Sequence, residues 1–252
     1  MHKTALITGA AHRIGRAIAT DLAAHGYDIA IHANRSVDAA RDLSERLARD
    51  HGVATTVLTG DLADPADVEA LVPAAIDALG PLSLLVNNAS QFAPDDAQSL
   101  ASPLWRSHMA INAEAPARLT SALAAQTDSP GLSRLAVNII DQRVWKPTPR
   151  YLSYSASKAA LWWLTRTMAQ ALAPDVRVNA IAPGPTLKAA SQTDADFGAI
   201  VAAVPLGKAP DLADFGRTVR YLHGAQSITG QMLALDGGQH LSWQTPDAVI
   251  NE

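Results

Sequence analysis

The chain has 252 residues, of which 48% are hydrophobic and 17% are charged. This composition supplies enough apolar side chains for a large buried sheet and excludes an intrinsically disordered chain. A formal net charge of -4 makes nucleic acid and anionic membranes poor partners. The absence of cysteine excludes disulfides, thiolate nucleophiles and zinc–thiolate sites, and the eight histidines show no metal-ligand spacing.

The start of the sequence and its apolar segments indicate where in the cell the protein is found. Residues 1–4 lead directly into an apolar strand pattern, which leaves no room for a signal peptide. No apolar run approaches the roughly 20 residues that a membrane-spanning helix needs. We therefore expect a cytoplasmic protein that acts on a small molecule, without a nucleic-acid or membrane partner.

Short apolar segments alternate with amphipathic segments along the whole chain. The expected strands span residues 5–8, 29–33, 55–58, 82–87, 135–140, 176–181 and 232–235. The expected helices span residues 14–22, 38–49, 151–173 and 211–223, and two more begin at Asp64 and Ser102, each followed by proline. Such alternation is typical of a parallel sheet with helices on both faces. The sequence therefore predicts a single Rossmann-like, doubly wound α/β domain over residues 1–252.

A segment rich in proline and glycine follows the sixth expected strand. Residues 182–187, with the polar residues that continue to Asp196, predict a loop or lid rather than a domain boundary. On the long expected helix before it, Trp162 and Trp163 indicate packing or subunit contacts. The last residues, 244–252, form a polar tail.

The turn between the first strand and the first helix carries two glycines. Gly9 permits a tight turn, and Gly15 lets the helix pack closely on the sheet. The free backbone N–H groups at the start of this helix can then face a pyrophosphate. A glycine pair alone is weak evidence, but its position in a strand–turn–helix unit favours a dinucleotide site.

The end of the second strand predicts which dinucleotide binds. An acidic residue at this point accepts from the 2′-hydroxyl of NAD, whereas this chain has Asn34, Arg35 and Ser36. Arg35 can pair with a 2′-phosphate and Ser36 can donate to it, so the pattern favours NADP(H). The alternative is a surface arginine that starts a solvated helix. Asp61 and Leu62, after the third strand, suit the adenine edge, although Asp61 equally suits a turn or a cap.

Tyr154 and Lys158 stand four residues apart on the long expected helix. This spacing places the phenol and the ammonium on one helical face. Because a nearby cation stabilises phenolate, Lys158 is expected to lower the pKa of Tyr154 towards that of a working proton donor. The same ammonium can hold the nicotinamide ribose. The helix follows the fifth strand, whose carboxyl end faces the same crevice as the glycine turn.

Taken together, these features resemble the short-chain dehydrogenase/reductase family over essentially the whole chain. The motifs that carry the resemblance are Thr8-Gly9 with Gly15, Asn87-Asn88-Ala89, Asn112, Tyr154 with Lys158, and Pro183-Gly184. The resemblance implies a seven-stranded parallel sheet, a homotetramer and an NADP-dependent oxidoreductase. The tyrosine is then the proton donor or acceptor, the lysine binds the ribose, and Asn112 supports a proton relay. Further cofactor contacts implied by the resemblance are Arg13, Ile14, Asn88, Ala89, Ser90, Pro183, Gly184 and Thr186, with Ser191 another candidate.

Two positions depart from the commonest pattern of this family. Asp141 stands where a serine usually pairs with the tyrosine, and Arg13 stands where the glycine turn usually has another glycine. Both departures resemble the pteridine reductase subgroup, which includes dihydromonapterin reductase-like bacterial enzymes. Asn34-Arg35-Ser36 resembles this subgroup too. So do Ser90 and Phe92, because the subgroup places a serine and an aromatic ring against the pterin.

The substrate implied by this resemblance is a flat pteridine ring. It can lie between the nicotinamide and the face of Phe92, while Arg13 donates to the pterin oxygen and the cofactor phosphates. Reduction of a ring C=N needs hydride at carbon and a proton at nitrogen, which an Asp141–Tyr154 pair can deliver if burial favours the protonated carboxyl. Each residue also has a structural alternative: Asp141 as a backbone cap, Phe92 as a packing ring and Arg13 as a phosphate ligand alone.

Three functions follow as hypotheses. The leading one is NADPH-dependent reduction of a dihydropterin or a related pteridine. The first alternative is a reductase of a ketone or a 3-oxoacyl thioester, which keeps Tyr154 and Lys158 but leaves Asp141 without a special role. The second is a non-catalytic NADPH-binding regulator. The intact Tyr154, Lys158 and Asn112 argue against a regulator, because a sensor needs only the dinucleotide site.

Overall fold

Seven parallel strands form one sheet in the computed structural model, which describes residues 3–126, 133–188 and 192–243. The strands are β1 (Thr4–Ile7), β2 (Asp28–Ala33), β3 (Thr55–Thr59), β4 (Leu84–Asn87), β5 (Arg134–Ile139), β6 (Val176–Pro183) and β7 (Met232–Leu235). Their order across the sheet is β3-β2-β1-β4-β5-β6-β7, and every neighbouring pair is parallel. The predicted seven-stranded parallel sheet is confirmed.

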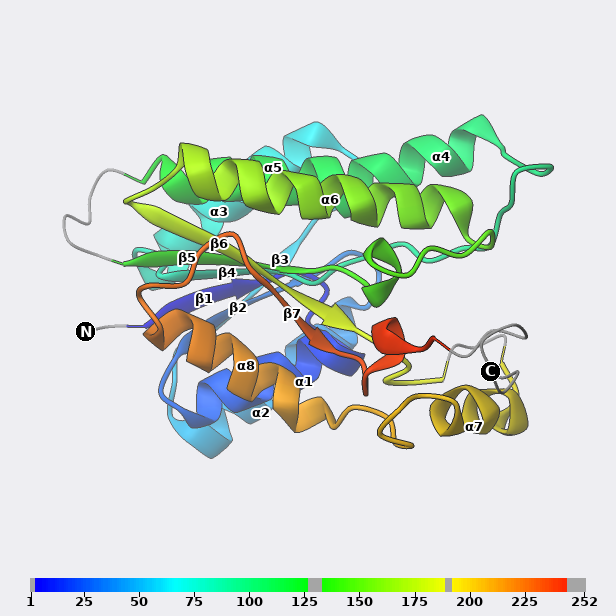
Figure 1. Cartoon of the computed structure of the whole chain (residues 1–252). Helices are drawn as coiled ribbons and strands as arrows, with labels where there is room; N and C mark the ends of the chain where they lie inside the picture. The colour runs from blue at the N-terminus through cyan, green and yellow to red at the C-terminus, as the bar shows by residue number, and fades with distance from the viewer. Residues whose placement is uncertain (1–2, 127–132, 189–191, 244–252) are drawn as a thin grey trace, which may run out of the picture.

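Helices cover both faces of this sheet (Figure 1). On one face lie α3 (Pro65–Leu79), α4 (Ser102–Met109), α5 (Ala115–Ala124) and α6 (Leu152–Ala171), and on the other lie α1 (Arg13–Ala24), α2 (Val37–His51) and α8 (Leu212–Gly224). A π-helical turn, η1 (Ala110–Glu114), joins α4 to α5. The predicted doubly wound arrangement is therefore confirmed. Among the described residues, no helix combines the length and the apolar character needed to cross a membrane.

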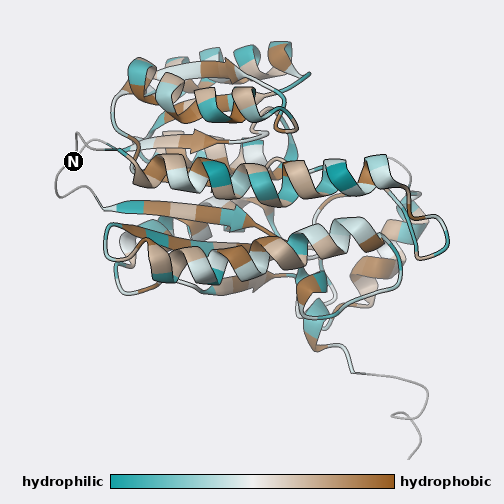
Figure 2. Ribbon diagram, turned by 90° about the horizontal axis from the view of Figure 1, so that it is seen from above, coloured by the Kyte–Doolittle hydropathy of each residue, from teal (hydrophilic) through white to brown (hydrophobic). Residues whose placement is uncertain are grey.

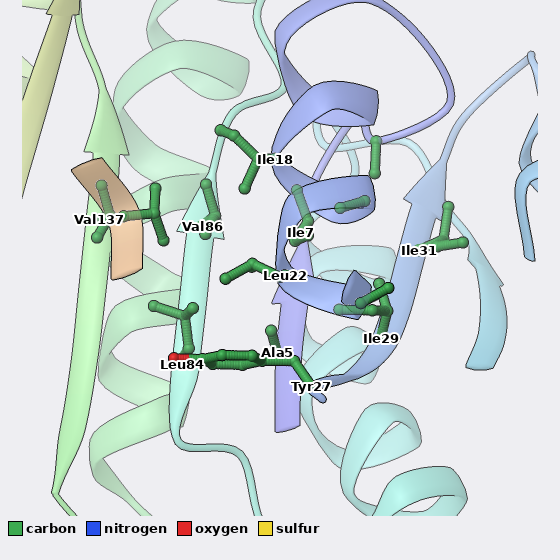
Figure 3. Packing of buried hydrophobic residues seen from close by; sticks show 14 of the residues in the cluster. Ala5, Ile7, Ile18, Leu22, Tyr27, Ile29, Ile31, Leu84, Val86 and Val137 are labelled. Atoms are coloured by element: carbon green, nitrogen blue, oxygen red, sulfur yellow. The ribbon is translucent and has the colours of Figure 1, made fainter. Parts of the chain in front are cut away.

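Alternate residues of each central strand pack on different layers of helices. In β1, Ala5 and Ile7 belong to the same buried cluster as Ile18 and Leu22 of α1 (Figure 3). Leu6, between them, belongs to the cluster on the other face. All five side chains are fully buried, and each large one contributes roughly 1.5–3 kcal/mol to folding. The surface helices alternate hydrophilic and hydrophobic residues (Figure 2), as expected when only one side of a helix faces the core.

The direction of winding reverses at β1, because β2 lies on one side of it and β4 on the other. In open α/β sheets, such a reversal leaves a crevice beyond the carboxyl ends of the strands. The loops after β1 and β4 border this crevice. It is therefore the place where the fold favours a ligand site.

One helix, α7 (Asp194–Ala202), has no counterpart among the expected helices. It begins inside the segment predicted as a loop up to Asp196, so that boundary is wrong. Thr193 Oγ1 accepts a hydrogen bond from the backbone N of Asp196 at 3.1 Å, and Asp196 Oδ2 accepts from the backbone N of Thr193 at 3.2 Å. This capping box starts the helix, and its Thr-x-x-Asp pattern is the signal for it in the sequence. Ser191 and the polar tail 244–252 lie outside the described residues.

A partly buried pair far from the crevice makes stability sensitive to acid. Tyr27 Oη and His223 Nδ1 lie 2.7 Å apart. Burial lowers the pKa of His223 to about 4, and the charges of Arg177 and Lys3 act in the same direction. The unfolded chain binds a proton here near pH 6.5, whereas the folded chain binds it only near pH 4. Stability from this group is therefore present above pH 6.5 and is lost as the pH falls towards 4.

We expect this histidine to remove about 2 kcal/mol from the free energy of unfolding when the pH drops from 7 to 5. His223→Gln keeps a polar partner for Tyr27 but cannot titrate. The free energy of unfolding of this variant should therefore fall by about 2 kcal/mol less than that of the wild type over the same pH range. Urea unfolding at the two pH values measures the difference. His51→Gln, at the exposed end of α2, is the control and should behave as the wild type. Equal losses in the wild type and His223→Gln would contradict the assignment.

Candidate active site

The loops at the carboxyl ends of the strands enclose a cleft of about 1060 Å³. It occupies the crevice at the winding reversal, where ligand sites of such folds concentrate. The predicted site residues that line it are Gly9, Arg13, Ile14, Gly15, Asn34, Arg35, Asp61, Leu62, Asn88, Ala89, Ser90, Phe92, Asp141, Tyr154, Lys158, Pro183 and Gly184. One cleft thus brings together most of the residues singled out from the sequence. Ser36, Asn112 and Thr186 do not line it.

Gly9 and Gly15 shape the end of the cleft at the start of α1. Gly9 has a φ of 62°, and a Cβ there would lie 2.9 Å from the Cα of Ala89. A Cβ on Gly15 would lie 2.6 Å from the carbonyl oxygen of Gly9. Neither position accepts a side chain without backbone movement. His12, the N-cap residue of α1, gives no side-chain cap, so the first N–H groups of the helix remain available to an anion.

Thr8 and Asn88 tie the loops after β1 and β4 together behind this end of the cleft. Thr8 Oγ1 accepts from the backbone N of Asn88 at 2.9 Å and from that of Ala89 at 3.0 Å. Asn88 Nδ2 donates to the carbonyl of Thr8 at 2.8 Å and to that of Gly9 at 3.1 Å. Asn88 therefore holds the glycine turn in place as well as lining the cleft.

Arg13, the first residue of α1, has a φ of 53°, a left-handed conformation that is costly for a residue with a side chain. Its Nη1 donates to the carbonyl of Lys188 at 3.0 Å, and its Nη2 donates to that of Leu187 at 2.9 Å. The guanidinium thus connects the glycine turn to the segment after β6. Strained residues of this kind concentrate at functional sites, which supports a role for Arg13 in binding.

At the far end of the cleft, Asn34 and Arg35 are exposed where β2 ends. Ser36 follows as the N-cap residue of α2, without a side-chain cap bond. Asp61 Oδ1 accepts from the backbone N of Ala63 at 2.9 Å, so this residue does shape a turn, the alternative left open by the sequence. It also lines the cleft, and the two roles are compatible.

His32, on β2, is a site residue that was not predicted from the sequence. Its Nδ1 accepts from the backbone N of Gly9 at 3.3 Å, and its Nε2 lies 3.1 Å from the carbonyl oxygen of Gly60. Burial lowers its pKa, an effect that the carbonyl and the charges of Asp67 and Asp61 oppose. A neutral imidazole that accepts at Nδ1 and donates at Nε2 therefore links the glycine turn to the end of β3.

Tyr154, Asp141 and Lys158 meet at the opposite end of the cleft. Tyr154 Oη donates to Asp141 Oδ2 at 2.9 Å, and Lys158 Nζ donates to the carbonyl of Ile139 at 2.9 Å. Asp141 follows β5, and its Oδ1 also accepts from the backbone N of Arg143 at 2.9 Å. The carboxylate thus acts both as the backbone cap left open by the sequence and as the partner of the phenol.

Burial raises the pKa of Tyr154 well above its usual value, and the charge and hydrogen bond of Asp141 add to this, while Arg143 opposes it. Burial lowers the pKa of Lys158 to about 8, against the effect of Asp141. The sequence predicts a lowered pKa for Tyr154. The structure gives the opposite direction, because desolvation and the neighbouring carboxylate outweigh the opposing charge, which is that of Arg143. The phenol is accordingly protonated at neutral pH, which suits a proton donor.

Asn112, in the π-helical turn η1, is fully buried behind the cleft. Its Oδ1 accepts from the backbone N of Gln91 at 2.8 Å and from Ser90 Oγ at 3.2 Å. Its Nδ2 donates to Ser157 Oγ at 3.0 Å. Asn112 therefore joins the loop after β4 to α6, and it supports the site from behind. Thr186 Oγ1 donates to the carbonyl of Gly184 at 3.2 Å and likewise lies off the cleft surface.

An aromatic wall borders the cleft beside Tyr154. Phe92, 45% exposed, stacks on Tyr151 with ring centroids 4.3 Å apart and planes 9° apart. It meets Tyr154 edge to face at 4.8 Å. The Arg143 guanidinium lies 5.1 Å from the Tyr151 centroid and 5.5 Å from that of Phe92, and its Nη1 is 4.0 Å from Asp141 Oδ2. This wall offers a flat surface for a planar ligand.

Several residues of the cleft besides His32 were not predicted from the sequence. They are His12, Ala63, Gln91, Ala93, Pro94, Ser107, Ile111, Ile139, Ile140 and Tyr151. Tyr151 had a usable signal, because the helix expected over residues 151–173 puts a residue three positions before Tyr154 on the same helical face. The loop residues had none, since loop geometry sets their contacts. No group of three or more metal-binding side chains occurs in the part of the chain that the structure describes.

Comparison with known proteins extends these observations. A family model described as "Enoyl-(Acyl carrier protein) reductase" matches residues 9–240. A "Short-chain type dehydrogenase/reductase" of Picea abies is 31% identical, with 94% of this chain and 92% of the relative covered. A "Glucose 1-dehydrogenase" of Gluconobacter oxydans is 30% identical, with 94% and 91% covered.

Solved structures show a greater similarity. FolM alternative dihydrofolate reductase 1 from Brucella canis, complexed with NADP, is 51% identical with a TM-score of 0.93, over 97% of this chain and 96% of the other. The corresponding Brucella suis protein, also with NADP, is 50% identical with a TM-score of 0.90, over 97% and 98%. The motifs, the fold and these matches agree: the chain belongs to the short-chain dehydrogenase/reductase family of oxidoreductases.

Proposed function

We propose that this oxidoreductase uses NADPH to reduce a dihydropterin or a related pteridine, in a single catalytic domain over residues 1–252. The observation that carries the proposal is the 2.9 Å hydrogen bond from Tyr154 to Asp141 beside the exposed ring of Phe92. It combines a proton source with a flat binding surface in one cleft. The similarity to two proteins named as alternative dihydrofolate reductases supports a pteridine substrate.

The predicted cofactor, NADP(H), agrees with the solved relatives, which hold NADP or NADPH. The cleft fits such a group, because the start of α1, which has no side-chain cap, borders it together with Gly9 and Gly15. Arg35 lies exposed at the end of β2, where an acid would favour NAD instead. When bound, NADPH supplies a hydride from its nicotinamide.

The residues of the cleft supply the proton and orient the ribose and the substrate. Reduction of a C=N bond adds hydride to carbon and a proton to nitrogen, and Tyr154 is placed to give that proton. Asp141, whose side chain is 18% exposed, can return a proton to the tyrosine from solvent. Lys158 sits beneath the tyrosine, with its Nζ 5.8 Å from the phenol ring centroid, and is placed to orient the ribose. Phe92 holds the substrate ring flat.

A second candidate is a reductase of ketones or 3-oxoacyl thioesters. The similarity to a glucose 1-dehydrogenase and to the "Granaticin polyketide synthase putative ketoacyl reductase 2" of Streptomyces violaceoruber, which is 30% identical, favours it. That reaction also uses Tyr154 and Lys158. It gives no role to the bond between Asp141 and Tyr154, which is why the pteridine reductase is preferred. A non-catalytic regulator is disfavoured, because the Tyr154–Asp141 pair serves no purpose in binding NADPH alone.

The assay that tests the proposal follows NADPH oxidation by the purified protein with a 7,8-dihydropterin. NADH and a simple ketone are run in parallel under the same conditions. Turnover with NADPH and the pterin, and little with NADH or the ketone, supports the proposal. Turnover with the ketone alone leaves the family assignment intact and removes the pteridine substrate.

Arg35→Ala should raise the Kd of NADPH by about ten- to a hundredfold and leave that of NADH unchanged. The arginine is the charged group placed to pair with the 2′-phosphate, which NADH lacks. Arg41→Ala is the matched control. Arg41 is another exposed arginine, six positions further along the chain in α2, but it pairs with Asp38. Titration of protein fluorescence with each dinucleotide measures both constants. A similar loss for NADH and NADPH would contradict the role of Arg35.

The resemblance to the family also leads us to propose a homotetramer. Trp163 on α6 is 64% exposed, and Trp105 on the neighbouring α4 is 37% exposed. Large exposed indoles are typical of surfaces that another subunit covers.

A further inference from the structure

A buried polar cluster lies beside the substrate half of the cleft. Asp95, His108 and Ser153 come from the loop after β4, from α4 and from the first turn of α6, and they are 7%, 0% and 0% exposed. Each is the direct neighbour in the chain of a residue that lines the cleft. Those neighbours are Pro94, Ser107 and Tyr154. The cluster therefore links the three segments that form this half of the site.

Asp95 caps the start of α6. Its carboxylate accepts from the backbone N of Ser153 at 3.1 and 3.2 Å and also from Ser153 Oγ. Its carbonyl accepts from the backbone N of Tyr151 at 2.8 Å. A carboxylate is favoured at a helix N-terminus, where free N–H groups and the helix dipole meet it. Tyr151 has a φ of 58°, so these bonds hold the chain in a conformation that it rarely adopts.

His108 completes the cluster and fixes the direction of its hydrogen bonds. The single O–H of Ser153 points to the carboxylate of Asp95, so His108 Nδ1 donates to Ser153 Oγ at 2.7 Å. The imidazole is then the neutral Nδ1–H tautomer. Burial lowers its pKa, and Lys158 acts in the same direction while Asp95 opposes it. The ring meets Tyr154 edge to face, with the centroids 6.1 Å apart.

We propose that Asp95, Ser153 and His108 are positioning residues that set the width of the substrate half of the cleft, where the substrate ring binds. Through Asp95 the loop that carries Phe92 is locked to the start of α6. The hydrogen bond between His108 and Ser153 connects the same helix start, which carries Tyr154, to α4. The cluster touches neither the glycine turn nor the end of β2, so it acts on the substrate and not on the cofactor. The identity of the substrate rests on the proposed function, whereas the positioning does not.

Ser153→Ala tests the inference by removing only the hydroxyl that joins Asp95 to His108. We expect kcat/KM for the substrate to fall about tenfold or more, because a charge-assisted bond is lost, while the Kd of NADPH is unchanged. Ser155→Ala is the matched control, since its hydroxyl on the same helix is buried without a hydrogen-bond partner among the described residues. The substrate in this test is whichever of dihydropterin or ketone the wild type reduces. A wrong substrate in the proposed function therefore shows in the wild-type assay, whereas a wrong positioning role shows in the variants.

Substitutions of His108 distinguish positioning from general loss of stability. The side-chain nitrogen of Asn lies as many bonds from Cβ as Nδ1 does, so His108→Asn keeps the donor to Ser153 and should retain most of kcat/KM. His108→Gln places its nitrogen one bond further and should lose about as much as Ser153→Ala. The inference is overturned if Ser153→Ala matches Ser155→Ala, if NADPH affinity falls in step with kcat/KM, or if the two His108 variants are equally active.

Discussion

Tyr154→Phe should lower kcat with NADPH and a dihydropterin about a thousandfold, a loss within the range for removal of a general acid. The substitution deletes only the hydroxyl that donates to Asp141 Oδ2 at 2.9 Å. The ring itself remains, with its contacts to Phe92 and His108. Because the phenol has a raised pKa and stays protonated at neutral pH, it can donate a proton beside the aromatic wall.

The Kd of NADPH should be nearly unchanged in Tyr154→Phe, because the glycine turn and Arg35 lie at the other end of the cleft. Stopped-flow measurement of NADPH oxidation gives kcat, and fluorescence titration gives Kd. Tyr221→Phe, at a tyrosine that is 58% exposed on α8, should retain full activity. A Tyr154→Phe enzyme with wild-type turnover would refute the assigned proton donor.

Asp141→Ser is expected to have the second largest effect, a loss of about a hundredfold in kcat/KM for a dihydropterin. The serine can still accept from Tyr154, but it cannot carry a proton from solvent to the tyrosine. A carbonyl substrate takes its proton from Tyr154 and needs from position 141 only a hydrogen bond to its oxygen, which serine supplies. Activity towards a ketone should therefore hold steady or rise in the same variant.

The ratio of the two kcat/KM values is the quantity to compare, because any general loss of folded protein cancels from it. Asp77→Ser, at an exposed position of α3, is the control and should leave the ratio as in the wild type. An Asp141→Ser enzyme that reduces the pterin almost as well as the wild type would show that this carboxylate has no part in proton delivery.

Local patterns in the sequence account well for the sheet. Strand residues such as Leu6 and Ile7 are buried on opposite faces, which is why β1 reads as a continuous apolar segment. Gly9 and Gly15 mark close backbone approaches that any side chain would block. Both kinds of signal depend on neighbours in the chain, so they are visible without the structure.

The substrate half of the cleft depends instead on contacts between distant segments. Arg143 reaches Tyr151 and Phe92 across separate loops, and Asp95 meets Ser153 from 58 positions away. No periodicity or short motif marks such pairs. The raised pKa of Tyr154 has the same origin, because burial and Asp141 determine it, whereas the sequence showed only the lysine four positions away.

Transfer of the hydride tests the proposed pteridine reduction most directly. NADPH that carries deuterium at C4 of the nicotinamide is incubated with the wild-type protein and a 7,8-dihydropterin, and the product is examined by NMR. We expect a tetrahydropterin with one deuterium on the carbon of the former C=N bond, and a nitrogen-bound hydrogen taken from solvent. A pterin recovered without deuterium, while a ketone in a parallel reaction acquires it, would contradict the proposed function.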